Sequence, residues 1–336
     1  MELIVFSKIE LIRFFWLTGL SFLIAMIWTP LLTSFLYKNR LGKRIRVDKN
    51  TPIFSKLHQH KSGTPTMGGV LIWITTAVLT LIFNLERRAT WLPLFALVTS
   101  GIIGAIDDLL NIRGIGAHGG GLRFREKFLL YTSVAAVGAW WFYFKLGWNS
   151  IHMPGVGDFT IGGWYIPLFI ISLVWAAFAS NETDGLDGLA GGIFALSYGA
   201  YAIIALTQGK VELALFCGTI MGSLLAFLWF NINPARFFMG DTGSMSLGVT
   251  LGIVAMLTNS ALLLPIIGFI LLVESLSVLI QLFSKKLFKR KIFLSTPIHH
   301  HLEASGWPEP KVVMRFWIIS AVMAVIGVII FLIDKS

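Results

Sequence analysis

The chain has 336 residues, of which 56% are hydrophobic and 13% are charged, and its mean hydropathy is +0.78. This composition excludes a water-soluble globular protein, because one soluble core cannot bury so much apolar surface. The formal net charge of +10 fits either a nucleic-acid or a membrane partner, and the single cysteine, Cys217, excludes both a disulfide framework and a cysteine-based metal site.

Apolar runs recur along the whole chain, and most are close to the roughly 20 residues that a helix needs to cross a bilayer. The first run lacks a small-residue cleavage site and exceeds a signal-peptide core, so we expect it to be retained. We predict an all-α, polytopic membrane bundle in which residues 1–336 form one transmembrane domain. Its ten transmembrane helices are expected near residues 14–36, 67–84, 91–107, 128–146, 164–180, 188–207, 211–230, 244–258, 262–283 and 312–333.

Basic residues concentrate in the connections after the odd-numbered runs, which hold most of the 27 Lys and Arg residues. By the positive-inside rule these connections face the cytoplasm, and both termini lie on the periplasmic side. The charge is thus explained by a lipid bilayer rather than by a nucleic acid, and the clusters at 38–49 and 285–291 are suited to anchoring on anionic headgroups. The predicted cytoplasmic loops are 38–66, 107–127, 181–187, 231–243 and 284–311.

The first of these loops leads directly into the second apolar run. Its end reads His58-Gln59-His60-Lys61-Ser62-Gly63-Thr64-Pro65-Thr66-Met67-Gly68-Gly69. A lysine followed by backbone amides and hydroxyls at a helix start suits a phosphate or a carboxylate. An ordinary capped helix start explains the segment equally well.

Two adjacent carboxylates, Asp107 and Asp108, end the third apolar run. Neighbouring carboxylates repel each other unless a cation or a lysine lies between them, which favours a divalent metal or a proton-handling role. The alternative is a plain helix terminus at the membrane interface.

The connection after the fifth run is rich in oxygen ligands and glycine. It reads Asn181-Glu182-Thr183-Asp184-Gly185-Leu186-Asp187-Gly188-Leu189-Ala190-Gly191-Gly192. If it is helical, Asn181, Asp184 and Asp187 share one face, and such hard ligands suit Mg²⁺ and phosphate rather than zinc. The alternation of Asp and Gly is similar to part of a calcium loop, but the spacing and terminal Glu of an EF-hand are absent.

The connection after the seventh run ends in a glycine-flanked aspartate at a helix start. It reads Asn231-Ile232-Asn233-Pro234-Ala235-Arg236-Phe237-Phe238-Met239-Gly240-Asp241-Thr242-Gly243-Ser244. Asp241 is well placed to hold a metal that bridges to phosphate, and Arg236 adds a phosphate-binding fork. A simple N-cap by Asp241 is the alternative.

The last cytoplasmic loop contains three consecutive histidines, His299, His300 and His301, with Glu303 nearby. Three adjacent residues cannot all face one metal in regular structure, so we favour phosphate binding or the orientation of a carboxylate over zinc binding. Glu274 lies inside an apolar run and should face the bundle, either in a structural hydrogen bond or lining a polar groove.

Taken in this order, the segments resemble the polyprenyl-phosphate N-acetylhexosamine-1-phosphate transferase superfamily and, within it, the phospho-N-acetylmuramoyl-pentapeptide transferases. The resemblance spans nearly the whole chain, and the Lys61 segment and the histidine run favour this branch over relatives that transfer N-acetylglucosamine-1-phosphate. The matching motifs are Lys61 with 63–69, Asp107-Asp108, 183–188, 239–244, 297–301 and the tail Gly306-Trp307-Pro308-Glu309-Pro310.

The resemblance implies a reaction in which undecaprenyl phosphate attacks UDP-MurNAc-pentapeptide, releasing UMP and forming lipid I, with Mg²⁺ required. It implies Asp241 as the Mg²⁺ ligand and a catalytic set of Asp107, Asp108, Asp241, Lys61 and His299. It implies substrate binding by Thr66, Lys127, Asn181, Asp184, Asp187, Asn231, Gly240, Ser244, His300 and His301. An inner-membrane location and a homodimer are expected through the resemblance alone.

Two positions depart from the family pattern, which usually has Asn where this chain has Phe178 and an apolar residue where it has Glu182. The departures bear on nucleobase contacts. Two other functions are the alternatives: a sister transferase that uses UDP-GlcNAc, and a transporter. A transporter should place its polar sites near the bilayer midplane on broken helices, whereas here the carboxylates gather at one interface.

Overall fold

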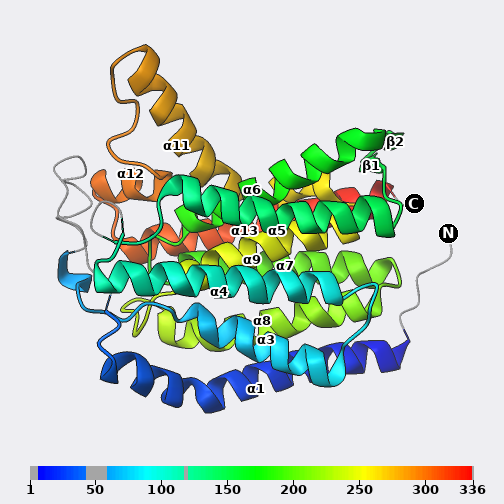
Figure 1. The fold of residues 1–336 in the computed structure, drawn as a ribbon, viewed down its shortest axis with the longest axis horizontal. Helices are drawn as coiled ribbons and strands as arrows, with labels where there is room; N and C mark the ends of the chain where they lie inside the picture. The colour runs from blue at the N-terminus through cyan, green and yellow to red at the C-terminus, as the bar shows by residue number, and fades with distance from the viewer. Residues whose placement is uncertain (1–6, 43–58, 117–119, 335–336) are drawn as a thin grey trace.

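The computed structural model describes residues 7–42, 59–116 and 120–334 (Figure 1). It is mostly helical, as predicted. The long helices are α1 (Lys8–Lys38), α3 (Gly69–Phe83), α4 (Trp91–Arg113), α5 (Phe124–Trp140), α6 (Tyr165–Thr183), α7 (Leu189–Thr207), α8 (Val211–Asn231), α9 (Asp241–Leu257), α11 (Phe269–Leu287) and α13 (Glu309–Asp334). Shorter pieces are α10 (Leu264–Ile267), α12 (Ile298–Ala304), 3₁₀ turns at Gln59–Lys61, Gly162–Trp164 and Ala261–Leu263, and a π-turn at Trp141–Lys145.

Each of the ten predicted apolar runs is largely helical, but fewer helices qualify as membrane spans. Among the described residues, six helices are long and apolar enough to cross a bilayer, or seven if a bent pair is counted as one span. The helices α3 and α9 have 15 and 17 residues, so at 1.5 Å per residue they are shorter than a bilayer core about 30 Å thick. The chain is thus a multi-pass membrane protein.

The run at 262–283, predicted as a span, is not one straight helix. The chain breaks between α10 and α11, whose axes differ by 83°. The break is local: Gly268, which follows the single turn of α10, takes non-helical dihedrals of −93° and 38°. Beyond the break, α11 leans away from the other helices (Figure 1).

A β-hairpin, which the all-α prediction omits, joins the π-turn to α6. The strands β1 (Ser150–Met153) and β2 (Gly157–Thr160) pair antiparallel, with Ser150 opposite Thr160 and Met153 opposite Gly157. The positive φ angles of Gly155 and Gly157 allow the tight turn between them. The hairpin is fastened to α13, because His152 lies between Asp158, at 2.7 Å, and Asp334.

The helix α9 lies at the centre of the bundle, and its residues from Thr242 to Leu257 are buried. It packs against α4, α6 and α3 (Figure 1). The approach is close where glycine removes the side chain: a Cβ atom at Gly104 would lie 2.4 Å from the Asp241 carbonyl oxygen, and one at Gly69 would lie 2.2 Å from the Cα of Gly243. These contacts fix the start of α9 against α3 and α4.

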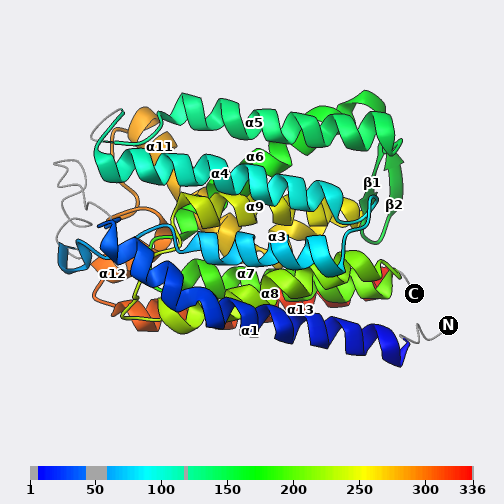
Figure 2. The same cartoon turned by 60° about the horizontal axis from the view of Figure 1, so that its bottom comes forward.

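The two ends of the bundle differ in character. The start of α1, the end of α13 and the hairpin lie together at one end (Figures 1 and 2). The helix α12 and the end of α4 lie at the other. The polar segments singled out in the sequence therefore gather at the end away from the termini.

Candidate active site

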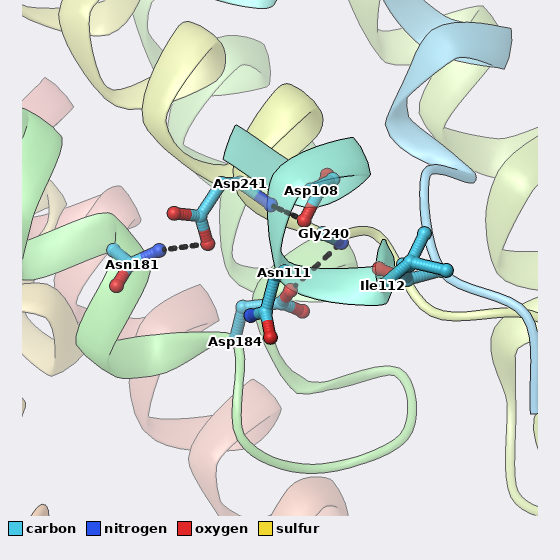
Figure 3. Close-up of a pocket in the computed structure, with 8 residues that line it drawn as sticks. Asp108, Asn111, Ile112, Asn181, Asp184, Gly240 and Asp241 are labelled. Carbon is cyan, nitrogen blue, oxygen red and sulfur yellow. Dashed lines mark hydrogen bonds between the residues drawn. The ribbon is translucent and has the colours of Figure 1, made fainter. Parts of the chain in front are cut away.

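A cavity of about 100 Å³ opens where α4, α6 and α9 meet (Figure 3). Its walls come from four of the five segments singled out in the sequence. The lining residues are Thr66, Asp108, Asn111, Ile112, Asn181, Asp184, Gly240 and Asp241. Residues that lie as far apart in the chain as 66 and 241 thus meet at one polar site.

Two carboxylates bind the backbone at the start of α9. Asp108 accepts hydrogen bonds from the amides of Asp241 and Thr242, each at 3.2 Å, and Asp184 accepts one from the amide of Gly240 at 3.1 Å. Gly240 has a φ of 75°, and a Cβ atom there would lie 2.5 Å from Asp108. Only glycine fits this position. Asp108 therefore supplies the cap for α9, so the side chain of Asp241 is not needed to cap its own helix.

The side chain of Lys127 joins two carboxylates next to the cavity. Its Nζ lies 2.7 Å from Asp107 Oδ2 and 2.5 Å from Asp241 Oδ2. The other Asp241 oxygen accepts a hydrogen bond of 2.7 Å from the amide of Asn181, and Asp107 accepts one of 2.5 Å from the amide of Leu122. A lysine between paired carboxylates is one of the two arrangements that the sequence favours for Asp107 and Asp108, but it joins Asp107 to Asp241.

Lys127 and Asp241 stabilise each other's charge. Burial disfavours the charged form of Lys127, but the carboxylates of Asp241 and Asp107 raise its pKa above the ordinary value. Burial likewise opposes ionisation of Asp241, yet Lys127, Asp107 and Asn181 hold its pKa below the usual range. Lys127 is therefore a cation and Asp241 an anion at neutral pH.

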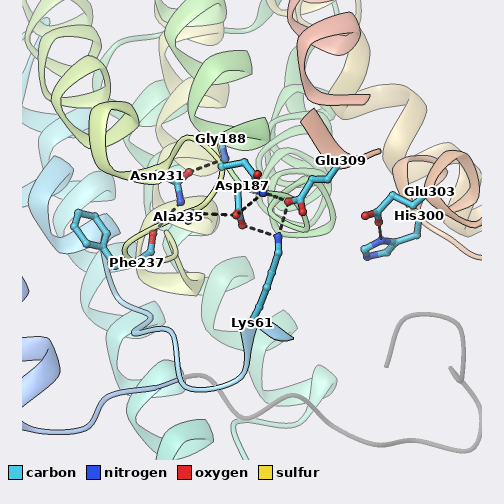
Figure 4. Close-up of polar contacts among 10 residues, drawn as sticks. Lys61, Asp187, Gly188, Asn231, Ala235, Phe237, His300, Glu303 and Glu309 are labelled. Atoms are coloured by element: carbon cyan, nitrogen blue, oxygen red, sulfur yellow. Dashed lines mark hydrogen bonds and ion pairs between the residues drawn. The ribbon is translucent and has the colours of Figure 1, made fainter. Parts of the chain in front are cut away.

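A second polar cluster surrounds Asp187 (Figure 4). Lys61 Nζ lies 2.7 Å from Asp187 and 2.5 Å from Glu309, and Glu309 also accepts the amide of Asp187 at 2.7 Å. The remaining Asp187 oxygen accepts from the side chain of Asn233, at 3.1 Å, and from the amide of Ala235, at 3.0 Å. The cluster joins the first loop, the 183–188 motif and the start of α13.

Asn231 belongs to this second cluster. Its side-chain oxygen accepts a hydrogen bond of 2.9 Å from the backbone amide of Gly188. Its side-chain nitrogen donates one of 2.9 Å to the backbone carbonyl oxygen of Phe237 (Figure 4). The side chain is only 4% exposed. Both ends of Asn231 therefore hold backbone segments in place.

The three histidines have different partners. His299 Nδ1 lies 3.0 Å from Glu274, and His300 Nδ1 lies 2.8 Å from Glu303. His301 Nδ1 accepts the amide of Leu294 at 3.2 Å. Glu274 is fully buried and faces the bundle, as predicted, and its polar contact is the 3.0 Å approach to His299.

The sequence-predicted site residues therefore divide into three groups. The cavity and its immediate neighbours contain Thr66, Asp107, Asp108, Lys127, Asn181, Asp184, Gly240 and Asp241, and Ser244 closes the first turn of α9 through a 3.1 Å bond to Gly240. Lys61, Asp187 and Asn231 form the second cluster, and His299, His300 and His301 lie on α12. His58 and the basic residues 43, 44, 46, 49 and 56 lie outside the described residues.

Three further features of this region complete the comparison with the sequence analysis. Sequence reasoning did not single out Glu309, and its position in the tail motif 306–310 was the available signal. The guanidinium of Arg236 lies 5.8 Å from the ring centre of Phe230 and is not part of the cavity wall. Phe178 packs on Phe124 with ring centres 5.2 Å apart, so an aromatic pair replaces the amide that the family usually has there.

The donor atoms at the cavity fit Mg²⁺. Within the described part of the chain, no three Asp, Glu, His or Cys side chains converge as a ready-made metal cage. Mg²⁺ does not require one, because it commonly binds one or two carboxylates and completes its shell with water and substrate phosphates. Asp241 and Asp184 supply such hard oxygen ligands on the cavity wall.

Comparison with known proteins agrees with the motifs. Residues 90–259 match the model of Glycosyl transferase family 4, and residues 61–72 match signature 1 of phospho-N-acetylmuramoyl-pentapeptide-transferase. A protein of that name from Chloroflexus aggregans is 40% identical, over 97% of this chain and 92% of its own length. One from Geobacillus thermodenitrificans is 39% identical, over 93% and 96%.

Proposed function

The chain belongs to the phospho-N-acetylmuramoyl-pentapeptide-transferase family, and we propose that it transfers phospho-MurNAc-pentapeptide from UDP-MurNAc-pentapeptide to undecaprenyl phosphate. The products are lipid I and UMP, and the reaction belongs to peptidoglycan synthesis. The observation that carries this proposal is the group formed by Asp107, Lys127 and Asp241 beside a polar cavity at one end of a membrane bundle.

The proposed transfer reaction depends more on the positioning of the two phosphates than on activation of a nucleophile. An oxygen of the lipid phosphate forms a bond to the sugar-bearing phosphorus of the nucleotide, and the bond between that phosphorus and the bridging oxygen breaks, so UMP leaves. One phosphoanhydride replaces another, and catalysis consists chiefly of alignment and charge neutralisation. The attacking phosphate, with a second pKa near 6, is mostly ionised at pH 7 and needs no strong base.

We assign the residues beside the cavity accordingly. Lys127 neutralises phosphate charge, and Asp107 orients the lipid phosphate through the ion pair that it shares with Lys127. Asn181 and Asp184 line the nucleotide side of the cavity, together with Thr66 and Gly240.

The other predicted site residues act around this centre. Lys61, Asp187 and Asn231 hold the loops that shape the nucleotide pocket. The histidines of α12 support the phosphate-binding region from the neighbouring loop, and Ser244 completes the first turn of α9.

Mg²⁺ is the proposed cofactor, held by Asp241. When bound, it would neutralise the charge that builds up on the phosphates during transfer. Asp108 and Asp184 bind the backbone amides on either side of Asp241 and keep its carboxylate on the cavity wall. This arrangement of the chain's own groups supports a metal-binding role for Asp241 rather than a capping role.

The reaction is tested by supplying purified protein in detergent with undecaprenyl phosphate, Mg²⁺ and either UDP-MurNAc-pentapeptide or UDP-GlcNAc. UMP release only from the muramoyl substrate, abolished by EDTA and restored by added Mg²⁺, is the expected result. Release only from UDP-GlcNAc would move the chain to the sister transferases. No release from either substrate by a folded preparation would count against the enzyme and make transport the next function to test.

We further propose that residues 1–336 form one transmembrane transferase domain that crosses the inner membrane ten times. Both termini would be periplasmic, and the loops 38–66, 107–127, 181–187, 231–243 and 284–311 would face the cytoplasm. The shared location of the start of α1 and the end of α13 supports an even number of crossings (Figure 1). A homodimer remains a prediction from the resemblance.

The topology can be tested by cysteine labelling, because the native Cys217 is fully buried and should stay unlabelled. We expect Val156→Cys, in the turn of the hairpin, to react with a membrane-impermeant maleimide added to intact spheroplasts. Lys291→Cys, in the loop before α12, is expected to react only after permeabilisation. The reverse pattern would invert the proposed orientation.

A further inference from the structure

Glu274 is a carboxylate buried far from solvent on α11. It is 0% exposed, and its Oε2 lies 3.0 Å from Nδ1 of His299, which is also 0% exposed. A carboxylate in an apolar setting is costly unless a polar partner meets it, so the contact with the imidazole offsets the cost of burial. The break at Gly268 sets the direction of α11 and so brings Glu274 to α12.

The opposite edge of the same imidazole packs against Gly185. A Cβ atom at position 185 would lie 2.2 Å from Nε2 and 2.8 Å from Cε1 of His299. No side chain fits in that space, so the ring touches the backbone of the loop between Asp184 and Asp187. The imidazole therefore lies between a fixed carboxylate on one side and this loop on the other.

The loop at 184–188 holds both polar clusters. Asp184 binds the amide of Gly240, next to the proposed Mg²⁺ ligand, and Asp187 pairs with Lys61 at 2.7 Å. A shift of this loop would move the carboxylates that fix Asp241 and Lys61. The contact between His299 and this loop therefore affects the geometry of the cavity.

We propose that Glu274 and His299 are positioning residues for the transfer reaction. The carboxylate of Glu274 fixes the imidazole through Nδ1, and the imidazole presses on Gly185 to set the place of Asp184 at the cavity. This inference rests on the proposed function for its kinetic consequence, but the support of the loop is a property of the folded chain alone.

Hydrogen exchange measured by mass spectrometry tests the support of the loop directly. Glu274→Leu keeps the volume and removes the oxygens, and we expect amides in 183–189 to exchange about tenfold faster, with the hairpin 150–160 unchanged. Glu274→Gln retains an acceptor for the ring and should show a smaller change. Thr29→Val is the matched control, because it also keeps the volume and removes a buried hydroxyl that bonds only the backbone of its own helix, α1. Unchanged exchange in Glu274→Leu, or an equal change in the control, would overturn the proposal.

Steady-state kinetics provide a further test, because a positioning residue should affect kcat more than KM. We expect Glu274→Leu to lower kcat for UMP release about tenfold, with KM for UDP-MurNAc-pentapeptide within about twofold, because alignment is lost and binding is not. A simple loss of folded protein would lower the active fraction without altering the exchange of the remaining folded molecules. If the unsubstituted chain releases no UMP, the proposed function fails, and the exchange measurement still decides whether the pair supports the loop.

The contact with Gly185 provides a second, independent test by a double-mutant cycle. Gly185→Ala places a methyl group against the ring and is expected to lower kcat about tenfold in the unsubstituted chain, but less than about twofold in a His299→Ala background. Gly163→Ala is the control, since nothing lies within 4 Å of the added atom. Losses that multiply independently would show that the ring and the loop do not act together.

Discussion

Replacing Asp241 by Asn is expected to slow UMP release by roughly 10²–10³-fold, the range seen when one preorganised charge-stabilising group is removed. The amide keeps the shape of the side chain and can still accept the hydrogen bond from Asn181. It removes the charge that faces Lys127 and that would hold Mg²⁺. Initial rates at saturating concentrations of both substrates, measured over a series of Mg²⁺ concentrations, are the test.

The matched control for this variant is Asp158→Asn, the same chemical change at an exposed carboxylate in the hairpin at the far end of the bundle. Its rate should stay within about twofold of the unsubstituted chain, as is usual for surface substitutions away from the site. If Asp241→Asn keeps the normal rate and the normal dependence on Mg²⁺, Asp241 is not the metal ligand. A lower rate with an unaltered Mg²⁺ dependence would also contradict that role.

Asp241 is available to bind a metal because other aspartates cap the start of α9. In many helices the first aspartate caps the exposed amides itself. Here Asp108 from α4 binds the amides of Asp241 and Thr242, and Asp184 binds that of Gly240. All three aspartates line the cavity, but Asp108 and Asp184 bind the backbone, whereas the carboxylate of Asp241 pairs with Lys127.

The helical architecture was largely predictable, because lipid as a solvent demands long apolar runs and the sequence shows them directly. Each predicted run is largely helical, although that at 262–283 is divided between α10 and α11, and the motif residues Asp108, Asn181 and Asp241 do meet at one cavity. The failures are local. The bend at Gly268 depends on one residue's dihedrals, and the hairpin has strands of only four residues, too short to leave a periodic signal.

The pairs across the site were harder to predict, because they join residues with no local relationship. Lys127 and Asp241 are 114 positions apart, and Lys61 and Glu309 are 248 apart. The sequence indicated that Asp107 needs a cation or a lysine nearby, but only the packing of α4, α5 and α9 shows which residue supplies it. Periodicity and capping signals act over a few residues, so tertiary pairs of this kind leave no trace in them.

Replacing Lys127 by Met is expected to reduce both activity and stability. The variant leaves Asp107 and Asp241 facing each other without the ammonium that lies 2.7 and 2.5 Å from them. Removing one partner of a buried ion pair costs about 3 kcal/mol, and since the Lys127 side chain is 20% exposed, we expect the lower end of the known range. UMP release should fall by roughly 10²-fold, because a charge that neutralises phosphate is lost.

The response of this variant to Mg²⁺ separates its two effects. A divalent cation beside Asp241 takes over part of the missing positive charge, so Mg²⁺ should raise the melting temperature of Lys127→Met more than that of the unsubstituted chain. Lys127→Arg retains the charge and should lose less of both properties, and Lys145→Met removes an exposed lysine beyond the end of α5 as a control. If Mg²⁺ stabilises Lys127→Met no more than the control, the cation does not bind among these carboxylates, and the site of the metal must be sought elsewhere on the cavity wall.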